Sequence, residues 1–151
     1  MPGARWDYAR GMTSSGKEAS QEEGSQESIR RRVLVAEDGS MLRTALIRLL
    51  DEADYEIEAV PDGAEALMLL LAEAAEPFDL LIADIVMPGL SGVELVRRMR
   101  ELMSNPPPVL YMSGDVRPAL NDAAGTIGGD LMLAKPFAAE QLLEAIETVL
   151  E

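Results

Sequence analysis

Five short segments with the apolar composition or the alternation of strands, each ending at a polar residue or a turn, constrain the fold of this chain more than any other feature. They lie at residues 33–36, 56–60, 78–83, 109–112 and 131–134. Segments with the apolar spacing or composition of helices follow them, at about 40–50, 64–73, 92–103, 118–124 and 138–150. Strands that alternate with helices in this way form a parallel sheet with helices on both faces.

The alternation therefore predicts an α/β fold of the flavodoxin-like, doubly wound type, with a five-stranded parallel sheet. Right-handed crossovers leave few strand orders, and 2-1-3-4-5, numbered along the chain, is the commonest at this size. We expect one domain over residues 30–151. Residues 1–29 are rich in Gly, Ser, Gln and Glu and show no apolar period, so we expect a disordered tail or linker there.

Polar residues stand where four of the predicted strands end. Glu37 and Asp38 follow the first strand, Asp84 the third, Ser113 the fourth and Lys135 the fifth. In a doubly wound sheet the carboxyl ends of parallel strands share one edge, and ligands bind there. These five residues are therefore predicted to converge on one crevice.

Such a crevice suits phosphoryl transfer. Three carboxylates held together repel one another unless a cation neutralises them, and oxygen-only ligands favour a hard ion such as Mg²⁺. Lys135 adds a compact positive charge and is the only lysine after residue 17. A divalent ion and a lysine can spread the charge of a transferring phosphoryl group while a carboxylate attacks it.

Composition removes several other functions. The chain has no cysteine and no histidine, which excludes disulfides, thiolate and Ser-His-Asp catalysis, and a histidine kinase core. Its net charge of −14 disfavours binding to nucleic acid or to anionic membranes. It also lacks a hydrophobic signal core and a membrane-spanning run, so we expect a cytoplasmic protein.

Four segments, taken in order, resemble the receiver domain of response regulators in two-component signalling. Residues 33–38 look like the strand that carries the acidic pair, and residues 81–92 like the phosphoacceptor segment. Residues 112–114 look like the switch hydroxyl segment, and residues 135–137 like the lysine motif. The resemblance covers about residues 32–151.

The resemblance implies a role for each site residue. Asp84 would accept a phosphoryl group from the phosphohistidine of a histidine kinase or a His-containing phosphotransfer protein. Asp38, Asp84 and the backbone carbonyl of Val86 would ligate Mg²⁺, with Glu37 close by or acting through a water. Ser113 would hydrogen-bond the phosphoryl group and Lys135 would pair with it. The bond from Lys135 to Pro136 would be cis.

Signalling would then proceed through protein–protein contacts rather than through enzyme activity. A homodimer through the face of the fourth helix, fifth strand and fifth helix is a further implication. Receivers usually carry Tyr or Phe three residues before the lysine, where this chain has Met132, which leaves the switching step in doubt. No output domain follows the last predicted helix, so we expect a single-domain regulator or part of a hybrid kinase.

Two other functions and one structural alternative stay open at this point. A metal-dependent phosphohydrolase also uses an Asp nucleophile at a strand end, but it usually has a second Asp two residues later, where this chain has Val86. A pseudo-receiver would keep the pocket only as an interaction platform. Asp38 and Asp84 could also simply cap helices.

Overall fold

A computed structural model describes residues 30–72, 76–114 and 124–151 of the chain. Its strands are β2 (Arg32–Ala36), β3 (Glu56–Val60), β4 (Leu80–Asp84), β5 (Val109–Ser113), β6 (Ala124–Ile127) and β7 (Asp130–Ala134). Its helices are α1 (Ser40–Glu52), α2 (Gly63–Ala72), α3 (Gly92–Leu102) and α4 (Ala139–Leu150). The tail predicted over residues 1–29 lies outside the described residues.

The strands form one sheet in the order β3-β2-β4-β5-β7-β6. The first five of these pair in parallel, and they correspond to the predicted order 2-1-3-4-5. The predicted flavodoxin-like architecture is therefore confirmed, with one additional strand. Each of the five parallel strands overlaps the apolar run that predicted it.

The additional strand, β6, pairs antiparallel with β7 and was not predicted. Most of the helix predicted at 118–124 lies outside the described residues, but Ala124 begins β6 and so is not helical. The sequence of β6 is Ala-Gly-Thr-Ile, which is too short and too glycine-rich to show a strand pattern. The Gly128–Gly129 pair that follows was the available signal, since both residues have positive φ (59° and 92°), as a tight hairpin turn requires.

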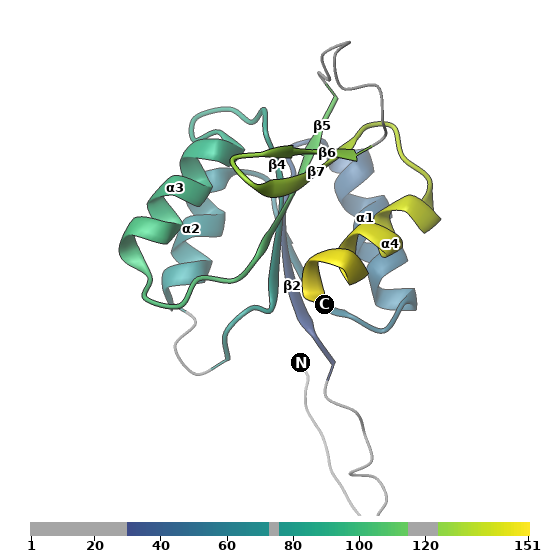
Figure 1. Cartoon of the computed structure of the whole chain (residues 1–151), viewed down its shortest axis with the longest axis horizontal. Helices are drawn as coiled ribbons and strands as arrows, with labels where there is room; N and C mark the ends of the chain where they lie inside the picture. Colours follow the sequence, from purple (N-terminus) through teal and green to yellow (C-terminus); the bar gives the residue numbers. More distant parts are fainter. Residues whose placement is uncertain (1–29, 73–75, 115–123) are drawn as a thin grey trace, which may run out of the picture. The chain divides into compact units, whose positions relative to one another are not determined.

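Two helices cover each face of the sheet, α1 and α4 on one side and α2 and α3 on the other (Figure 1). The central strands β4 and β5 are buried along their whole length, which explains why they read as continuous apolar runs. The core beneath α2 and α3 includes Leu70, Leu95 and Met99. The core beneath α1 and α4 includes Leu46 and Ile146.

The two helices that begin nearest the predicted site start differently. At α3 the N-cap Ser91 accepts a hydrogen bond at its hydroxyl from the backbone N–H of Glu94, at 3.1 Å. At α1 the N-cap is Gly39, which has no capping side chain. The start of α1 therefore needs another anchor.

Among the described helices, none combines the length and the apolar character needed to cross a membrane.

Candidate functional site

The register of the parallel strands brings the predicted site residues to one edge of the sheet. Asp84, the last residue of β4, pairs with Met112, and Ser113, the last residue of β5, pairs with Ala134 directly before Lys135. Glu37 follows β2 at the same edge, and its N–H donates to the carbonyl of Val60 at 3.0 Å. The predicted convergence is therefore present in the structure.

Three carboxylates form a compact cluster at this edge. Each of Glu37, Asp38 and Asp84 offers one carboxylate oxygen, and these oxygens all lie within 4.8 Å of one another. Glu37 and Asp84 are 2% and 5% exposed, whereas Asp38 is exposed. A buried pair and an exposed third ligand leave the cluster open to solvent on one side.

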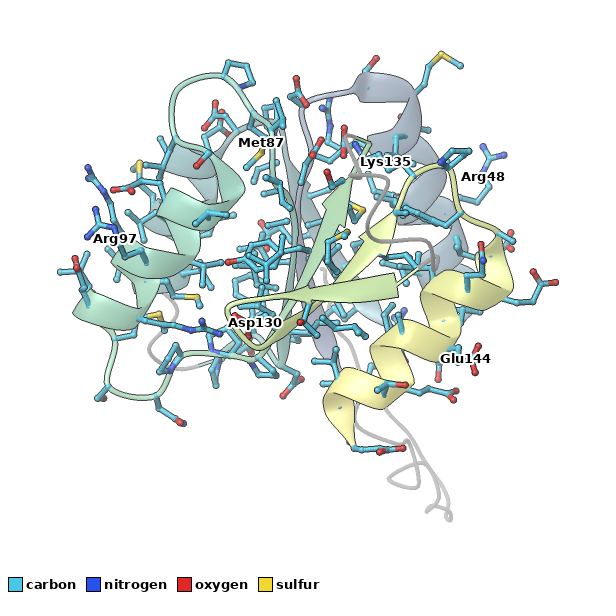
Figure 2. All side chains as sticks on the ribbon, turned by 45° about the horizontal axis from the view of Figure 1, so that its top comes forward. Arg48, Met87, Arg97, Asp130, Lys135 and Glu144 are labelled. Atoms are coloured by element: carbon cyan, nitrogen blue, oxygen red, sulfur yellow. The ribbon has the colours of Figure 1, made fainter. Side chains whose placement is uncertain are left out.

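Lys135 joins the two buried carboxylates. Its Nζ donates to Oδ2 of Asp84 at 2.7 Å and to Oε1 of Glu37 at 3.0 Å. Figure 2 shows Lys135 at the end of the sheet, beside the loop that precedes α4. The peptide bond from Lys135 to Pro136 is cis, as the resemblance implied.

The pKa values of the buried Glu37 and the partly buried Lys135 are both raised. Burial raises the pKa of the Glu37 carboxyl above 4.5, and repulsion from Asp84 adds to this, while the Gly39 N–H and Lys135 oppose it. For Lys135, burial acts to lower the pKa, but hydrogen bonds to Asp84 and Glu37 outweigh it and hold the pKa above 10.5. Lys135 is therefore charged at neutral pH, whereas burial disfavours the ionised form of Glu37.

The backbone around Asp84 fixes this residue tightly. The N–H of Val86 donates to Oδ1 of Asp84 at 3.1 Å, and the N–H of Ile85 donates to the carbonyl of Met112 at 2.9 Å. Gly92, the first residue of α3, packs directly on the carbonyl of Asp84. A Cβ at residue 92 would clash with the Asp84 carbonyl oxygen and would lie 3.0 Å from both the Asp84 carbonyl carbon and the Ile85 Cα.

Ser113 and Val86 also lie at the site. Ser113 is 4% exposed, and its backbone carbonyl accepts a hydrogen bond from the N–H of Lys135 at 2.8 Å. The side chain of Val86 is 64% exposed and makes an apolar rim beside Asp84. The predicted bonds from the Ser113 hydroxyl to a phosphoryl group and from the Val86 carbonyl to Mg²⁺ stay predictions.

Simple helix capping does not account for the acidic residues. In the described residues the N-caps of α1 and α3 are Gly39 and Ser91, so neither Asp38 nor Asp84 has that role. The sequence pattern had not singled out Arg43, whose guanidinium hydrogen-bonds the carbonyls of Glu37 and Asp38. An arginine one turn into a helix that lacks a capping side chain was the only signal for it.

The cluster of carboxylates fits the coordination preferences of Mg²⁺. All three side-chain ligands are carboxylates, their oxygens are close enough to share an ion, and one side is open to water and to a phosphoryl oxygen. The burial that raises the pKa of Glu37 is also the condition in which a cation is most favourable. Two carboxylates of the cluster, those of Glu37 and Asp84, also bond the ammonium group of Lys135.

Known proteins resemble this chain in sequence. The family model for the response regulator receiver domain matches residues 33–147. The response regulator receiver protein CpdR of Brucella abortus is 35% identical over 120 residues, which is 80% of this chain and 97% of that protein. The sensory/regulatory protein RpfC of Xanthomonas campestris pv. campestris is 35% identical over 118 residues, but the match spans only 16% of its length.

Solved structures give the same result. Chemotaxis protein CheY4 of Vibrio cholerae superposes with a TM-score of 0.64 at 32% identity, over 80% of this chain and 99% of that one. The receiver domain of the hybrid histidine kinase CckA superposes with a TM-score of 0.65, also at 32% identity, over 80% of this chain and 99% of that one.

Proposed function

The chain belongs to the response regulator receiver domain family of two-component signalling, and from that premise we propose that Asp84 accepts a phosphoryl group with the help of Mg²⁺. The observation that carries the proposal is the pair of contacts that Lys135 makes. Its ammonium bridges Asp84 and Glu37 at 2.7 and 3.0 Å, so a positive charge stands where a transferring phosphoryl group would develop negative charge.

Asp84 suits the role of acceptor by its placement. It is fixed by Val86 N–H at one carboxylate oxygen and by Lys135 at the other, so its position is set before a donor arrives. In the transfer, a carboxylate oxygen of Asp84 would attack phosphorus. The bond from phosphorus to the donor's imidazole nitrogen would break, and that nitrogen would keep the electron pair. Ser113 would hydrogen-bond the new acyl phosphate.

The carboxylates of Glu37, Asp38 and Asp84, with the carbonyl of Val86, would hold Mg²⁺. When bound, the ion would neutralise charge on the phosphoryl oxygens. The chain's own residues supply the rest: an oriented acceptor, a fixed ammonium group, and a sheet edge that excludes water from the buried side of Glu37 and Asp84.

We propose that the phosphoryl donor is a histidine kinase or a His-containing phosphotransfer protein, and that the domain signals in the cytoplasm through protein contacts rather than by enzyme turnover. The homodimer predicted through the fourth helix, fifth strand and fifth helix remains part of this proposal. Of that face, the structure describes β7 and α4.

The test is phosphorylation of the purified chain by a small phosphodonor with and without Mg²⁺, followed by intact mass. We expect one added phosphoryl group in the wild type, no addition with EDTA, and none in Asp84→Asn. Asp51→Asn, an exposed acid on α1, serves as the matched control and should label like the wild type.

Three outcomes would overturn the proposal. Labelling of Asp84→Asn at the wild-type level would remove Asp84 as the acceptor. Failure of the wild type to label with a small donor, and also to respond to beryllofluoride with Mg²⁺ in NMR spectra, would favour the silent pseudo-receiver. Release of many equivalents of phosphate from a phosphate ester would instead favour the phosphohydrolase.

A further inference from the structure

Arg43 makes two contacts with the backbone of the acidic pair. Its Nη1 donates to the carbonyl oxygen of Glu37 at 2.9 Å and to that of Asp38 at 3.2 Å. Arg43 lies in the second turn of α1, and its own N–H donates to the carbonyl of Gly39 at 2.9 Å. The Arg43 side chain therefore ties α1 to Glu37 and Asp38, the first two residues of the connection between β2 and α1.

The connection has few other anchors. It consists of Glu37, Asp38 and Gly39, between the end of β2 and the start of α1. Gly39, the N-cap, contributes no capping side chain, and the first turn of α1 contains no acidic residue. The Gly39 N–H donates to Oε2 of Glu37 at 2.9 Å, which holds the glutamate but not the aspartate.

The position of the Asp38 carboxylate depends on the backbone of this connection more than the positions of the Glu37 and Asp84 carboxylates do. Glu37 and Asp84 are buried and bound by Lys135. The Asp38 carboxylate is exposed, and within the part of the chain that the structure describes no side chain donates a hydrogen bond to it. Where its oxygens lie relative to the other two carboxylates is therefore set by the main chain, and Arg43 holds the carbonyl of that main chain.

We propose that Arg43 is a positioning residue for the metal site: it clamps the carbonyls of Glu37 and Asp38 so that the Asp38 carboxylate stands ready beside Asp84. The inference rests on the proposed function in naming Mg²⁺ as the ion. The residue acts through the backbone and touches neither the ion nor the phosphoryl group. Groups that orient metal ligands in this way commonly matter about tenfold or more for metal affinity.

The direction in which Mg²⁺ affinity changes when Arg43 is replaced distinguishes a positioning role from a purely electrostatic one. Arg43 is a cation close to a cation site, so removing its charge should by itself strengthen Mg²⁺ binding. The clamp predicts the opposite. We expect Arg43→Met to weaken Mg²⁺ affinity about tenfold or more, measured by calorimetric or NMR titration at a temperature where the variant is fully folded.

Two further variants complete the comparison. Arg48→Met removes the same charge from the same helix, but Arg48 is exposed on the outer side of α1, away from the connection (Figure 2). Its Mg²⁺ affinity should equal or slightly exceed that of the wild type. Arg43→Lys keeps the charge but lacks the guanidinium, so it should recover only part of the affinity, and it is also the fallback if Arg43→Met does not fold.

A second measurement needs no metal. Amide hydrogen exchange at Gly39 in the metal-free protein should be faster in Arg43→Met than in Arg48→Met, because the connection loses its clamp. Equal or tighter Mg²⁺ binding by Arg43→Met, or full recovery by Arg43→Lys, would overturn the inference. If the wild type binds no Mg²⁺, the metal step of the proposed function fails. The role of Arg43 is then tested by hydrogen exchange at Gly39 alone, and exchange unchanged in Arg43→Met would overturn the clamp.

Discussion

Tyr111 on β5 lies directly opposite Met132 on β7, and both side chains are buried in the core beneath α2 and α3. Met132 stands where receivers usually carry an aromatic residue that turns inward on activation. In this chain the aromatic ring belongs to the neighbouring strand instead. The two positions share one space in the core, so a large side chain at one restricts the size at the other.

This relationship predicts coupling between the two positions. Met132→Tyr alone adds a ring beside Tyr111 and should lower the free energy of unfolding by about 1–3 kcal/mol through overpacking. Tyr111→Met alone should also destabilise, by leaving space. The double exchange should recover much of the loss, with a coupling energy of about 0.5–3 kcal/mol in urea unfolding. Strictly additive effects would show that the two side chains do not share one space.

A pH dependence follows from Glu37. Its pKa in the folded protein is raised above 4.5 by burial, so the folded state holds a proton that the unfolded state has released. Stability of the metal-free protein should therefore fall as pH rises from about 4.5 through the raised pKa of Glu37. Glu37→Gln should flatten this slope and make the metal-free protein more stable at neutral pH.

To test this, the urea midpoint of unfolding is measured for both proteins, the wild type and Glu37→Gln, in EDTA at a series of pH values from about 4 to 8. This range is roughly the one over which a carboxyl with a raised pKa titrates. The same variant should bind Mg²⁺ more weakly, since one carboxylate is gone. A lower stability of Glu37→Gln than of wild type at neutral pH would contradict the expectation, because it would mean that the bond with Lys135 outweighs the burial of the charge.

Lys135 bonds two of the carboxylates that are proposed to hold the metal ion. We expect Lys135→Met to destabilise the metal-free protein by up to about 3 kcal/mol, since two buried carboxylates lose their cation, with the partial exposure of Lys135 limiting the effect. The variant should nevertheless bind Mg²⁺ more tightly and should accept no phosphoryl group at a measurable rate. Calorimetry would check this, with Arg48→Met as the control for charge; unchanged affinity would show that the ammonium and the ion occupy separate places.

The contact between Gly92 and the backbone carbonyl of Asp84 predicts that even a small side chain at residue 92 will displace the backbone at the site. Gly92→Ala places a Cβ against the Asp84 carbonyl, so α3 or Asp84 must move. We expect a loss of about 1–3 kcal/mol in unfolding free energy and slower phosphorylation at Asp84. Gly114→Ala is the control for stability, because among the described residues a Cβ there would meet only Lys135 Cδ, at an ordinary 3.8 Å. Equal stability of the two variants would mean that the start of α3 can move without loss.

The sequence predicted those parts of the fold in which the residue pattern of a single segment indicates whether that segment is buried or exposed. The buried strand β4 appears as an apolar run, and Asp84 marks its end, so both the strand and the candidate acceptor could be found without coordinates. Topology rules then supplied the shared edge. The contact of Lys135 with Asp84 follows from that edge even though 51 residues separate them.

The features that escaped prediction depend on relations between segments. The strand β6 forms because Gly128 and Gly129 turn it back onto β7, not because its own residues favour a strand. Arg43 is one of many helix surface arginines until its carbonyl partners are known. That Tyr111 faces Met132 requires the register of β5 with β7, which no single-segment pattern contains.

The ammonium group of Lys135, placed between two carboxylates, also affects which ion charge the site would favour. Three carboxylates and one ammonium group at the site leave, when all are ionised, an excess of two negative charges, which one divalent ion would balance. A monovalent ion would leave the pocket negative and a trivalent ion would make it positive before any donor approached. Electroneutrality therefore favours a divalent ion in the resting site. The arrival of a dianionic phosphoryl group then disturbs that balance, and rearranging Lys135 is the most direct way for the protein to restore it.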